Sequence, residues 1–388
     1  MTTELGANRT KIVCTIGPAT RAPETLQALV RAGMNVARVN YSHGTADEHA
    51  ETIRRIRQVA ASERAVVAVL ADLQGPKLRL GDLARSLDLA VGDRITLTSD
   101  VAADGSRGRF PLPHPELIEG ARPGGRLVFG DGEPEAIVRE VGLHALVAEI
   151  TVAGRLSSRR GIAAPGTGGS LEALTPKDQD DARAAVACGA DYVALSFVRA
   201  GSDVRRLREL LAALPGGAGV GIVAKIEKPE AIENLDDILE VSDAVMVARG
   251  DLGVEISPQD VPMHQKAIIR QCNRLGKPVI TATQMLQSMT DSPRPTRAEA
   301  SDVANAILDG TDAVMLSAET ATGRFPVQAA AMMREIAILA ERQMPWHIDD
   351  VATRKAEHPH PVTDAISDAA VRIADKVGAR LIVTSTWS

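Results

Sequence analysis

The chain has 388 residues and a net charge of −6, with acidic and basic residues interspersed and few aromatic rings. This composition offers neither the basic face nor the stacking side chains that nucleic-acid binding requires. The three cysteines lie far apart, residues 1–10 lack the apolar core of a signal peptide, and no apolar run could span a bilayer, so we expect a cytoplasmic protein with reduced thiols.

Short apolar runs rich in β-branched residues recur eight times along the chain, and helical periodicity separates most of them, as in 229–239 and 261–275. The runs cover residues 11–17, 35–40, 66–72, 192–198, 221–227, 244–250, 278–284 and 313–319. Strands that alternate with helices predict βαβ units, and eight such units close into an α/β fold, the (β/α)8 TIM barrel. Catalytic side chains of such barrels lie where the strands end.

The alternation is interrupted after the third run, where short strands and Gly/Asp turns extend from Leu78 to about Ser170. The strands expected there are 86–89, 94–98, 126–129, 136–139 and 145–152. We therefore predict an all-β domain, inserted as a lid after strand 3, with 163–169 as its return hinge.

The predicted domain organisation has four parts. A barrel of residues 8–77 and 171–343 carries the inserted β-barrel lid, 78–170; a linker, 344–361, leads to a partial C-terminal α/β unit, 362–388. That last unit comprises a helix, 362–377, and a strand, 380–384, which is too little apolar material for an independent domain.

Lys225 and Glu227 end the fifth run, and Asp251 follows the sixth between two glycines. Two carboxylates from neighbouring strands suit Mg²⁺, which completes its shell with water and substrate oxygens. A lysine beside one of them can stabilise charge that develops during phosphoryl or enolate chemistry. The alternative is that Lys225 and Glu227 form a structural ion pair in the polar end of the barrel.

Further polar residues follow the other strands. Arg38 presents a guanidinium that matches phosphate, whereas His43 alone is better explained as a residue at a helix start than as a catalyst. Arg79 and Arg160 open and close the lid, and from sequence alone either is equally a solvated surface residue. The Thr296 hydroxyl is expected to cap a helix, with Glu299 completing a capping box.

Taken together, six segments closely resemble the pyruvate kinase family. They are KIVCTIGPAT (11–20), MNVARVNYSHG (34–44), AKIE (224–227), VARGDLG (247–253), ATQML (282–286) and PRPTRAE (293–299). The resemblance covers nearly the whole barrel in the family's order. It implies Mg²⁺-dependent phosphoryl transfer from phosphoenolpyruvate to ADP, giving pyruvate and ATP in the last step of glycolysis.

The resemblance also implies roles for individual residues. Lys225 and Thr283 would be catalytic, with Lys225 stabilising the transition state and Thr283, through water, a candidate proton donor to the enolate. Glu227 and Asp251 would hold Mg²⁺, for which Mn²⁺ can substitute. The residues implied to bind substrate are Arg38, Lys225, Gly250, Asp251 and Thr283, and those implied to bind nucleotide are Asn40, Tyr41, Ser42, His43, Arg79 and Arg160.

A monovalent cation site departs from the family pattern. Many members hold K⁺ with residues matching Asn40, Ser42, Asp72 and Leu73, with threonine at the last position and a glutamate where this chain has Lys77. An ammonium group beside Asp72 would supply the charge that K⁺ brings, so we expect that K⁺ is not required. The alternative is that Lys77 extends into solvent at the lid hinge.

Other departures are Arg160 in place of the family's usual lysine, Thr322 in place of a lysine, and a C-terminal domain that stops at Ser388. The resemblance implies a homo-oligomer, with a dimer through barrel contacts and a doubtful tetramer. Two other functions remain open: a Mg²⁺-dependent lyase acting on pyruvate or phosphoenolpyruvate, and a non-catalytic paralogue that assembles with a longer partner.

Overall fold

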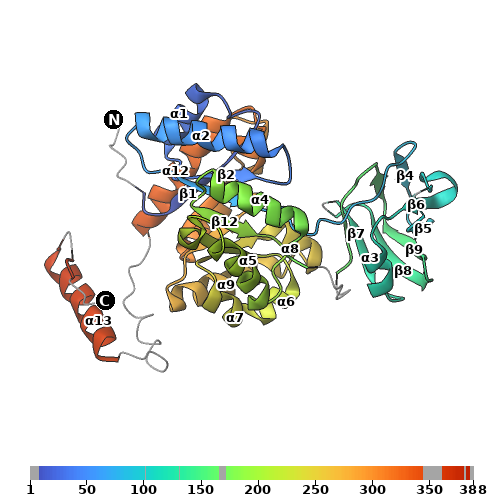
Figure 1. The fold of residues 1–388 in the computed structure, drawn as a ribbon. Coiled ribbons are helices and arrows are strands. Elements are labelled where there is room, and N and C mark those ends of the chain that lie inside the picture. The colour runs from blue at the N-terminus through green and yellow to red at the C-terminus, as the bar shows by residue number, and fades with distance from the viewer. Residues whose placement is uncertain are drawn as a thin grey trace. The chain divides into compact units, whose positions relative to one another are not determined.

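The computed structural model describes residues 8–100, 102–130, 132–165, 172–343, 361–379 and 382–384. Its centre is a closed barrel of eight parallel strands in the order β1-β16-β15-β14-β13-β12-β3-β2 (Figure 1). The strands are β1 (Lys11–Ile16), β2 (Val36–Asn40), β3 (Ala68–Asp72), β12 (Tyr192–Leu195), β13 (Gly221–Ile226), β14 (Ala244–Ala248), β15 (Val279–Ala282) and β16 (Ala313–Leu316). Each lies within one of the eight expected runs, so the predicted TIM barrel is confirmed.

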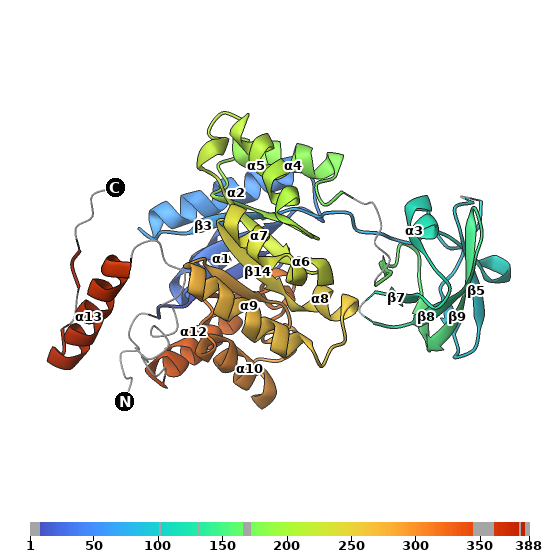
Figure 2. The same ribbon diagram turned by 90° about the horizontal axis from the view of Figure 1, so that it is seen from below.

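Helices surround these strands on both sides (Figure 2). They are α1 (Pro23–Ala32), α2 (Ala46–Ser62), α4 (Pro176–Ala187), α5 (Gly201–Ala212), α6 (Pro229–Glu233), α7 (Leu235–Val241), α8 (Arg249–Glu255), α9 (Val261–Leu275), α10 (Arg297–Leu308), α11 (Ala318–Ala321) and α12 (Pro326–Gln343). The capping box expected at Thr296 is present, because Thr296 accepts a bond from the Glu299 N–H while the Glu299 carboxylate accepts one from the Thr296 N–H. The helical stretch expected over 229–239 is present as two helices, α6 and α7. They are separate because Asn234 leaves the helical conformation, and its amide donates to the Arg199 carbonyl.

Apolar side chains from successive strands fill the barrel, as in Val13, Leu70, Val223, Met246 and Ile280. These residues are buried to nine-tenths or more, so the interior is a packed core and not a pore. Polar chemistry is therefore confined to the strand ends.

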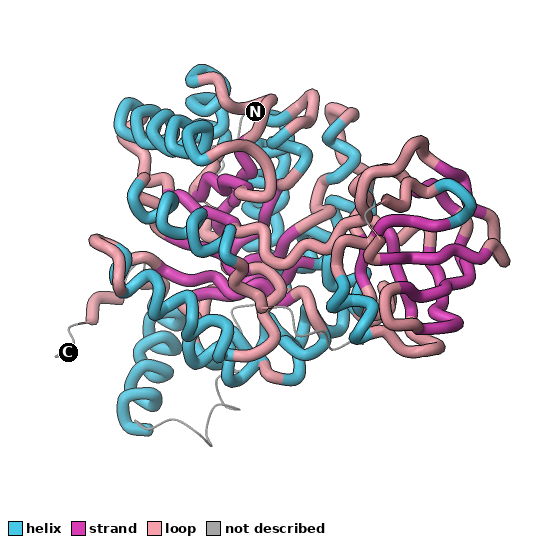
Figure 3. The backbone as a smooth tube through the Cα atoms, turned by 45° about the vertical axis from the view of Figure 1, so that its right-hand side comes forward, coloured by secondary structure: helices cyan, strands magenta, loops and turns pink. Residues whose placement is uncertain are grey.

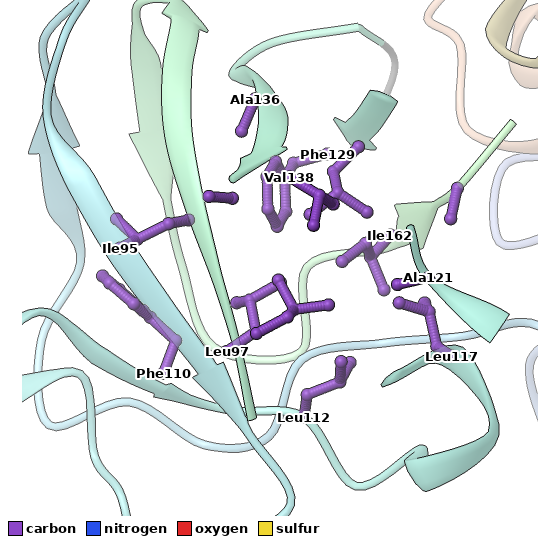
Figure 4. Packing of buried hydrophobic residues seen from close by; sticks show 14 of the residues in the cluster. Ile95, Leu97, Phe110, Leu112, Leu117, Ala121, Phe129, Ala136, Val138 and Ile162 are labelled. Atoms are coloured by element: carbon purple, nitrogen blue, oxygen red, sulfur yellow. The ribbon is translucent and has the colours of Figure 1, made fainter. Parts of the chain in front are cut away.

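The inserted domain begins after β3 and is built mainly of strands (Figure 3). It contains β4 (Leu87–Leu89), β5 (Arg94–Thr98), β6 (Arg109–Pro111), α3 (Pro115–Gly120), β7 (Arg126–Phe129), β8 (Glu135–Val141), β9 (Ala145–Val152), β10 (Gly154–Leu156) and β11 (Ile162–Ala163). Six of the strands form one sheet in the order β11-β7-β8-β9-β5-β6, and β10 pairs with β4. Its own core includes Ile95, Leu97, Phe110, Phe129 and Val138 (Figure 4).

The two connections of this domain meet at one buried carboxylate, that of Asp178 in the first turn of α4. Its Oδ1 accepts a hydrogen bond from the Gly75 N–H (3.0 Å) on the outgoing segment. Its Oδ2 accepts from the N–H (3.0 Å) and the hydroxyl (2.5 Å) of Thr175 on the return segment. Asp178 thus fixes both connections to the same helix end.

The C-terminal part of the chain, 342–388, is a separate compact unit. Its helix α13 (Pro361–Val377) matches the helix expected over 362–377. Of the expected strand 380–384, residues 382–384 are not in a strand and 380–381 lie outside the described residues. Residues 344–360 of the expected linker and 166–169 of the expected hinge also lie outside them. Within the described ranges, no helix is long and apolar enough to cross a membrane.

Candidate active site

Lys225, near the C-terminal end of β13, is the centre of a cluster of buried polar groups. Its Nζ lies 2.9 Å from Glu227 Oε1 and 3.2 Å from Asp72 Oδ1. It also donates a 2.7 Å hydrogen bond to Ser196 Oγ, whose own hydroxyl donates to the Leu73 carbonyl. The strands β3, β12 and β13 are neighbours in the barrel, so their ends bring these groups together.

The electrostatics of this cluster favour a charged lysine. Burial alone would lower the pKa of Lys225, but the carboxylates of Asp72, Glu227 and Asp251 outweigh it and raise that pKa. Burial also opposes ionisation of Asp72, yet Lys225 and Arg38 hold the pKa of that carboxyl below its usual value. The cluster therefore presents an ammonium group in a site from which water is largely excluded.

Glu227 is fully buried, and burial, reinforced by Asp251, raises its pKa to about 7 despite the neighbouring Lys225. Its Oε2 accepts a 2.7 Å hydrogen bond from the Phe197 N–H. Its Oε1 contacts Lys225 but accepts no well-aligned hydrogen bond. One carboxylate oxygen thus retains capacity for a further positive partner.

Arg38 leaves β2 toward the same cluster. Its Nε donates to Asp72 Oδ2 at 2.6 Å, and its Nη1 donates to Thr15 Oγ1 at 2.9 Å. The Arg38 side chain is 13% exposed, which leaves part of the guanidinium accessible beside Lys225. Arg38, Asp72 and Lys225 therefore form one connected network.

Thr283, just after β15, has a left-handed backbone with φ 70°. Its Oγ1 accepts a 2.8 Å hydrogen bond from the Gly250 N–H and donates to the Ala282 carbonyl at 2.6 Å. Gly250 and Asp251 belong to the first turn of α8, directly after β14. Gly250 and Thr283 are thus in direct contact, and Asp251 follows Gly250 in the same helical turn.

The residues present fit Mg²⁺ with few protein ligands. Glu227 and Asp251 are close enough that Asp251 raises the pKa of Glu227, and Glu227 Oε1 is a buried oxygen with unused acceptor capacity. Among the described residues no group of three or more His, Cys, Asp or Glu side chains forms a complete metal cage. Two carboxylates with open positions are the pattern of an ion that also binds substrate oxygens.

The residues predicted to bind nucleotide differ in how far their side chains are exposed to solvent. Ser42 and Asn40 are half-buried, and the Ser42 N–H donates to Asn40 Oδ1 at 3.1 Å, while His43 is exposed. For the Tyr41 side chain the prediction is wrong: it is 1% exposed and its ring packs on His49, with centroids 4.1 Å apart. Tyr41 continues the alternation of β2 on the side of Val39, opposite Arg38, and this side is buried, so its ring lies against His49 of α2.

Arg79 and Arg160 line one large cavity of about 1230 Å³ that also includes Gly250, Asp251 and Thr283. Arg79 Nη1 donates to the Arg159 carbonyl at 3.1 Å, and Arg160 Nη2 donates to the Glu133 carbonyl at 3.2 Å. The Nε of Arg160 is buried without a partner, so this guanidinium has donor capacity left.

Lys77 also lines this cavity, but its side chain is exposed and the structure does not bring it against Asp72. The Asp72 carboxylate is instead occupied by Arg38 and Lys225. The predicted placement of Lys77 near Asp72 is therefore not met in this structure, because the two nearer cations already satisfy that carboxylate.

Two residues of the site make contacts that the sequence analysis did not predict. Ser196, within the expected run 192–198, was given no role, yet it is the hydrogen-bond acceptor for Lys225. Asp72 was considered only as a cation ligand, yet it links Lys225 with Arg38. Their position at strand ends was the available signal, since a barrel brings all such ends to one face.

Comparisons with known proteins indicate the family of this chain. Residues 7–330 match the family model described as the pyruvate kinase barrel domain. A pyruvate kinase from Agrobacterium vitis is 46% identical, with 98% of this chain and 78% of that protein covered. One from Geobacillus stearothermophilus is 43% identical over 98% of this chain and 65% of its own length. For pyruvate kinase 2 from Synechocystis the values are 47%, 97% and 64%.

A solved structure gives the same result for the fold. The crystal structure of a pyruvate kinase from Cryptosporidium parvum superposes with a TM-score of 0.91 at 36% sequence identity, covering 97% of this chain and 78% of that chain. The present chain thus spans between about two thirds and four fifths of these relatives. From the family match, the relatives and the shared fold, the chain belongs to the pyruvate kinase family.

Proposed function

We propose that this chain transfers the phosphoryl group of phosphoenolpyruvate to ADP, forming pyruvate and ATP, with Mg²⁺ as cofactor and Mn²⁺ as a substitute. The observation that carries the proposal is the Lys225 ammonium, which is held within 3.2 Å of Asp72 and Glu227 and bonded to Ser196. A fixed positive charge in a dry site is what stabilises a transferring phosphoryl group and a developing enolate.

The residues of the candidate active site are proposed to have the following roles. Arg38 binds the phosphoryl group, and Lys225 stabilises the negative charge that develops on the bridging oxygen as its bond to phosphorus breaks and it becomes the enolate oxygen. The Thr283 hydroxyl and the backbone of Gly250 and Asp251 position phosphoenolpyruvate. Glu227 and Asp251 hold Mg²⁺, which when bound neutralises charge on the substrate oxygens. Thr283 with a water molecule is the proposed proton donor to the enolate carbon.

ADP is proposed to bind in the cavity lined by Arg79 and Arg160, with Asn40, Ser42 and His43 as further proposed contacts. Arginine suits this task because its guanidinium matches phosphate oxygens bidentately. The unpartnered Nε of Arg160 supports this assignment. For Tyr41 only the backbone remains a candidate contact.

The K⁺ requirement is proposed to be absent. Arg38 and Lys225 already place two cations on the buried Asp72 carboxylate, which satisfies its charge without an added ion. Lys77, which lines the cavity and is exposed, supplies a further positive charge where many family members carry a glutamate.

We also propose that the protein is cytoplasmic and forms a homodimer through barrel contacts. Its proposed domains are the barrel (8–77 with 171–343), the lid (78–170), the linker (344–361) and the partial C-terminal unit (362–388). The inserted domain is proposed to act as a lid, since both of its connections converge on Asp178.

A coupled assay for pyruvate tests the function directly. Phosphoenolpyruvate and ADP should yield pyruvate only with Mg²⁺ or Mn²⁺ present. Lys225→Met should lose this activity. Lys11→Met is its matched control and should keep the activity, because Lys11 is exposed at the opposite end of the barrel, at the start of β1. Pyruvate formation without ADP would favour a lyase or phosphatase, and its absence under all conditions would contradict the proposal.

A further inference from the structure

Two consecutive residues after β15, Thr283 and Gln284, are in the left-handed region, with φ of 70° and 53°. Neither is glycine, and a β-branched threonine is particularly disfavoured there. Such a conformation persists only where surrounding contacts hold it. Thr283 is a proposed catalytic residue, so the side chain that holds this turn also affects catalysis.

The Arg249 side chain contacts the backbone of this turn. Its Nη2 donates a 2.7 Å hydrogen bond to the Thr283 carbonyl, and its Nε donates to the Ala282 carbonyl at 3.3 Å. The next residue, Gly250, donates its N–H to Thr283 Oγ1 at 2.8 Å. Thr283 is therefore bonded at both its carbonyl and its hydroxyl by two consecutive residues at the start of α8.

The opposite edge of the Arg249 guanidinium is anchored to two helices. Its Nη1 donates to Asp302 Oδ1 of α10 at 2.9 Å and to Gln265 Oε1 of α9 at 3.3 Å. The side chain is only 11% exposed, so the Asp302 ion pair is shielded from solvent on the arginine side. Two packed helices thereby determine where the guanidinium lies.

No N–H of Arg249 is left for a substrate. A guanidinium has five N–H donors, and the fifth points to Met285 Sδ at 2.8 Å, after the two carbonyls, Asp302 and Gln265. A phosphate could bind only if one of these bonds broke. The contacts of Arg249 thus favour a positioning role over direct substrate binding, although the residue lines the cavity.

We propose that Arg249 is a positioning residue that holds Thr283 in its left-handed conformation, and that Asp302 and Gln265 orient it. The proposal builds on the proposed function, because it assigns a task that serves Thr283. A lysine cannot replace this fork, since one ammonium group cannot reach two carbonyls and a carboxylate in the same geometry.

A double-mutant cycle tests the proposal. Arg249→Lys should lower kcat roughly a hundredfold, the typical cost of misplacing a catalytic group by about 1 Å, with KM for ADP nearly unchanged. In a Thr283→Ala background the same substitution should cost less than about twofold, because the group it positions is already absent. Arg205→Lys, which alters an exposed ion pair with Asp237, is the matched control and should leave kcat unchanged.

Two kinetic outcomes would overturn it. One is an equal fold-loss in both backgrounds, which would separate Arg249 from Thr283. The other is an increase in KM for ADP with kcat unchanged, which would make Arg249 a direct nucleotide ligand.

A crystal structure of the Arg249→Lys variant gives a second readout that does not require activity. Thr283 should leave the positive-φ region in that variant, and a turn unchanged from the parent would contradict the proposal. If the unmodified protein does not convert phosphoenolpyruvate and ADP, the proposed function fails, and the crystallographic result alone decides the role of Arg249.

Discussion

Lys225→Met removes the positive charge at the centre of the polar cluster while keeping a side chain of similar length. Its Nζ lies 2.9 Å from Glu227 and 3.2 Å from Asp72, with the lysine side chain 9% exposed, so solvent cannot replace the lost charge. Removing one preorganised electrostatic group from such a site costs about 3 kcal/mol in the transition state. That corresponds to a fall in kcat of about 150-fold.

The folded state should tolerate the substitution better than catalysis does. Arg38 still pairs with Asp72 at 2.6 Å. Glu227, whose pKa burial already raises to about 7, can take up a proton when its lysine is gone. We therefore expect a lower kcat with phosphoenolpyruvate binding nearly intact.

The coupled pyruvate assay measures kcat, and calorimetric titration measures phosphoenolpyruvate binding in the presence of Mg²⁺. Lys11→Met serves as the control for a lysine-to-methionine change at the other end of the barrel. A Lys225→Met variant that keeps more than about a tenth of the parent turnover would remove Lys225 from the centre of the mechanism.

Three further predictions concern protons, cations and stability. Because burial raises the pKa of Glu227 to about 7, a metal that binds below that pH must displace the proton of this carboxyl group. The apparent Kd for Mn²⁺, measured by calorimetry, should therefore rise up to about tenfold per pH unit below 7. A constant Kd between pH 5 and 8 would refute this. Activity should be high in tetramethylammonium buffer without K⁺, and Lys77→Glu should make it rise with added KCl; a parent enzyme that is nearly inactive without K⁺ would contradict the cation proposal. Asp72→Asn should lower the free energy of unfolding at pH 7 by about 3 kcal/mol, since it strips Arg38 and Lys225 of their shared buried partner. Because Lys225 and Arg38 lower the pKa of Asp72, its contribution is present above pH 3.8 and is lost as pH falls through the folded-state pKa, so the difference from the parent in denaturant titrations should shrink in acid.

Much of the barrel could be predicted because its signals are local. Apolar runs bounded by polar residues identified all eight strands, and three lid strands, β5, β7 and β9, have the bounds that the sequence indicated. The lid strands that were missed, β6, β10 and β11, are only two or three residues long. Strands this short form because a partner strand pairs with them, which no local pattern reports.

The site was partly predictable for the same reason. Strand alternation placed Lys225 and Glu227 on one side of β13, where they do meet. The same alternation, carried one step beyond β2, would have placed Tyr41 with the buried Val39 and excluded its ring from the nucleotide site.

Contacts between distant segments could not be deduced in this way. The five acceptors around Arg249 come from α9, from α10 and from the residues at and after the end of β15. The position of Lys77 depends on the conformation of the lid connection, and not on its distance from Asp72 in the sequence. Such contacts depend on tertiary packing, which a single sequence read for periodicity does not contain.

The bonds that Asp178 makes to Gly75 and Thr175 also bear on how an insertion of this size is accommodated. Because the segments that flank the inserted domain, at Gly75 and Thr175, are bonded to one carboxylate, the two points where the chain leaves and re-enters the barrel are held together between β3 and α4. The entropy cost of closing a loop grows only slowly with its length, so a long insertion between these two fixed points adds little to it. The β3–α4–β12 unit can therefore form with any insert whose termini lie side by side, or with a short linker in its place. Asp178 thus separates the closure of the barrel from the size of its insertion.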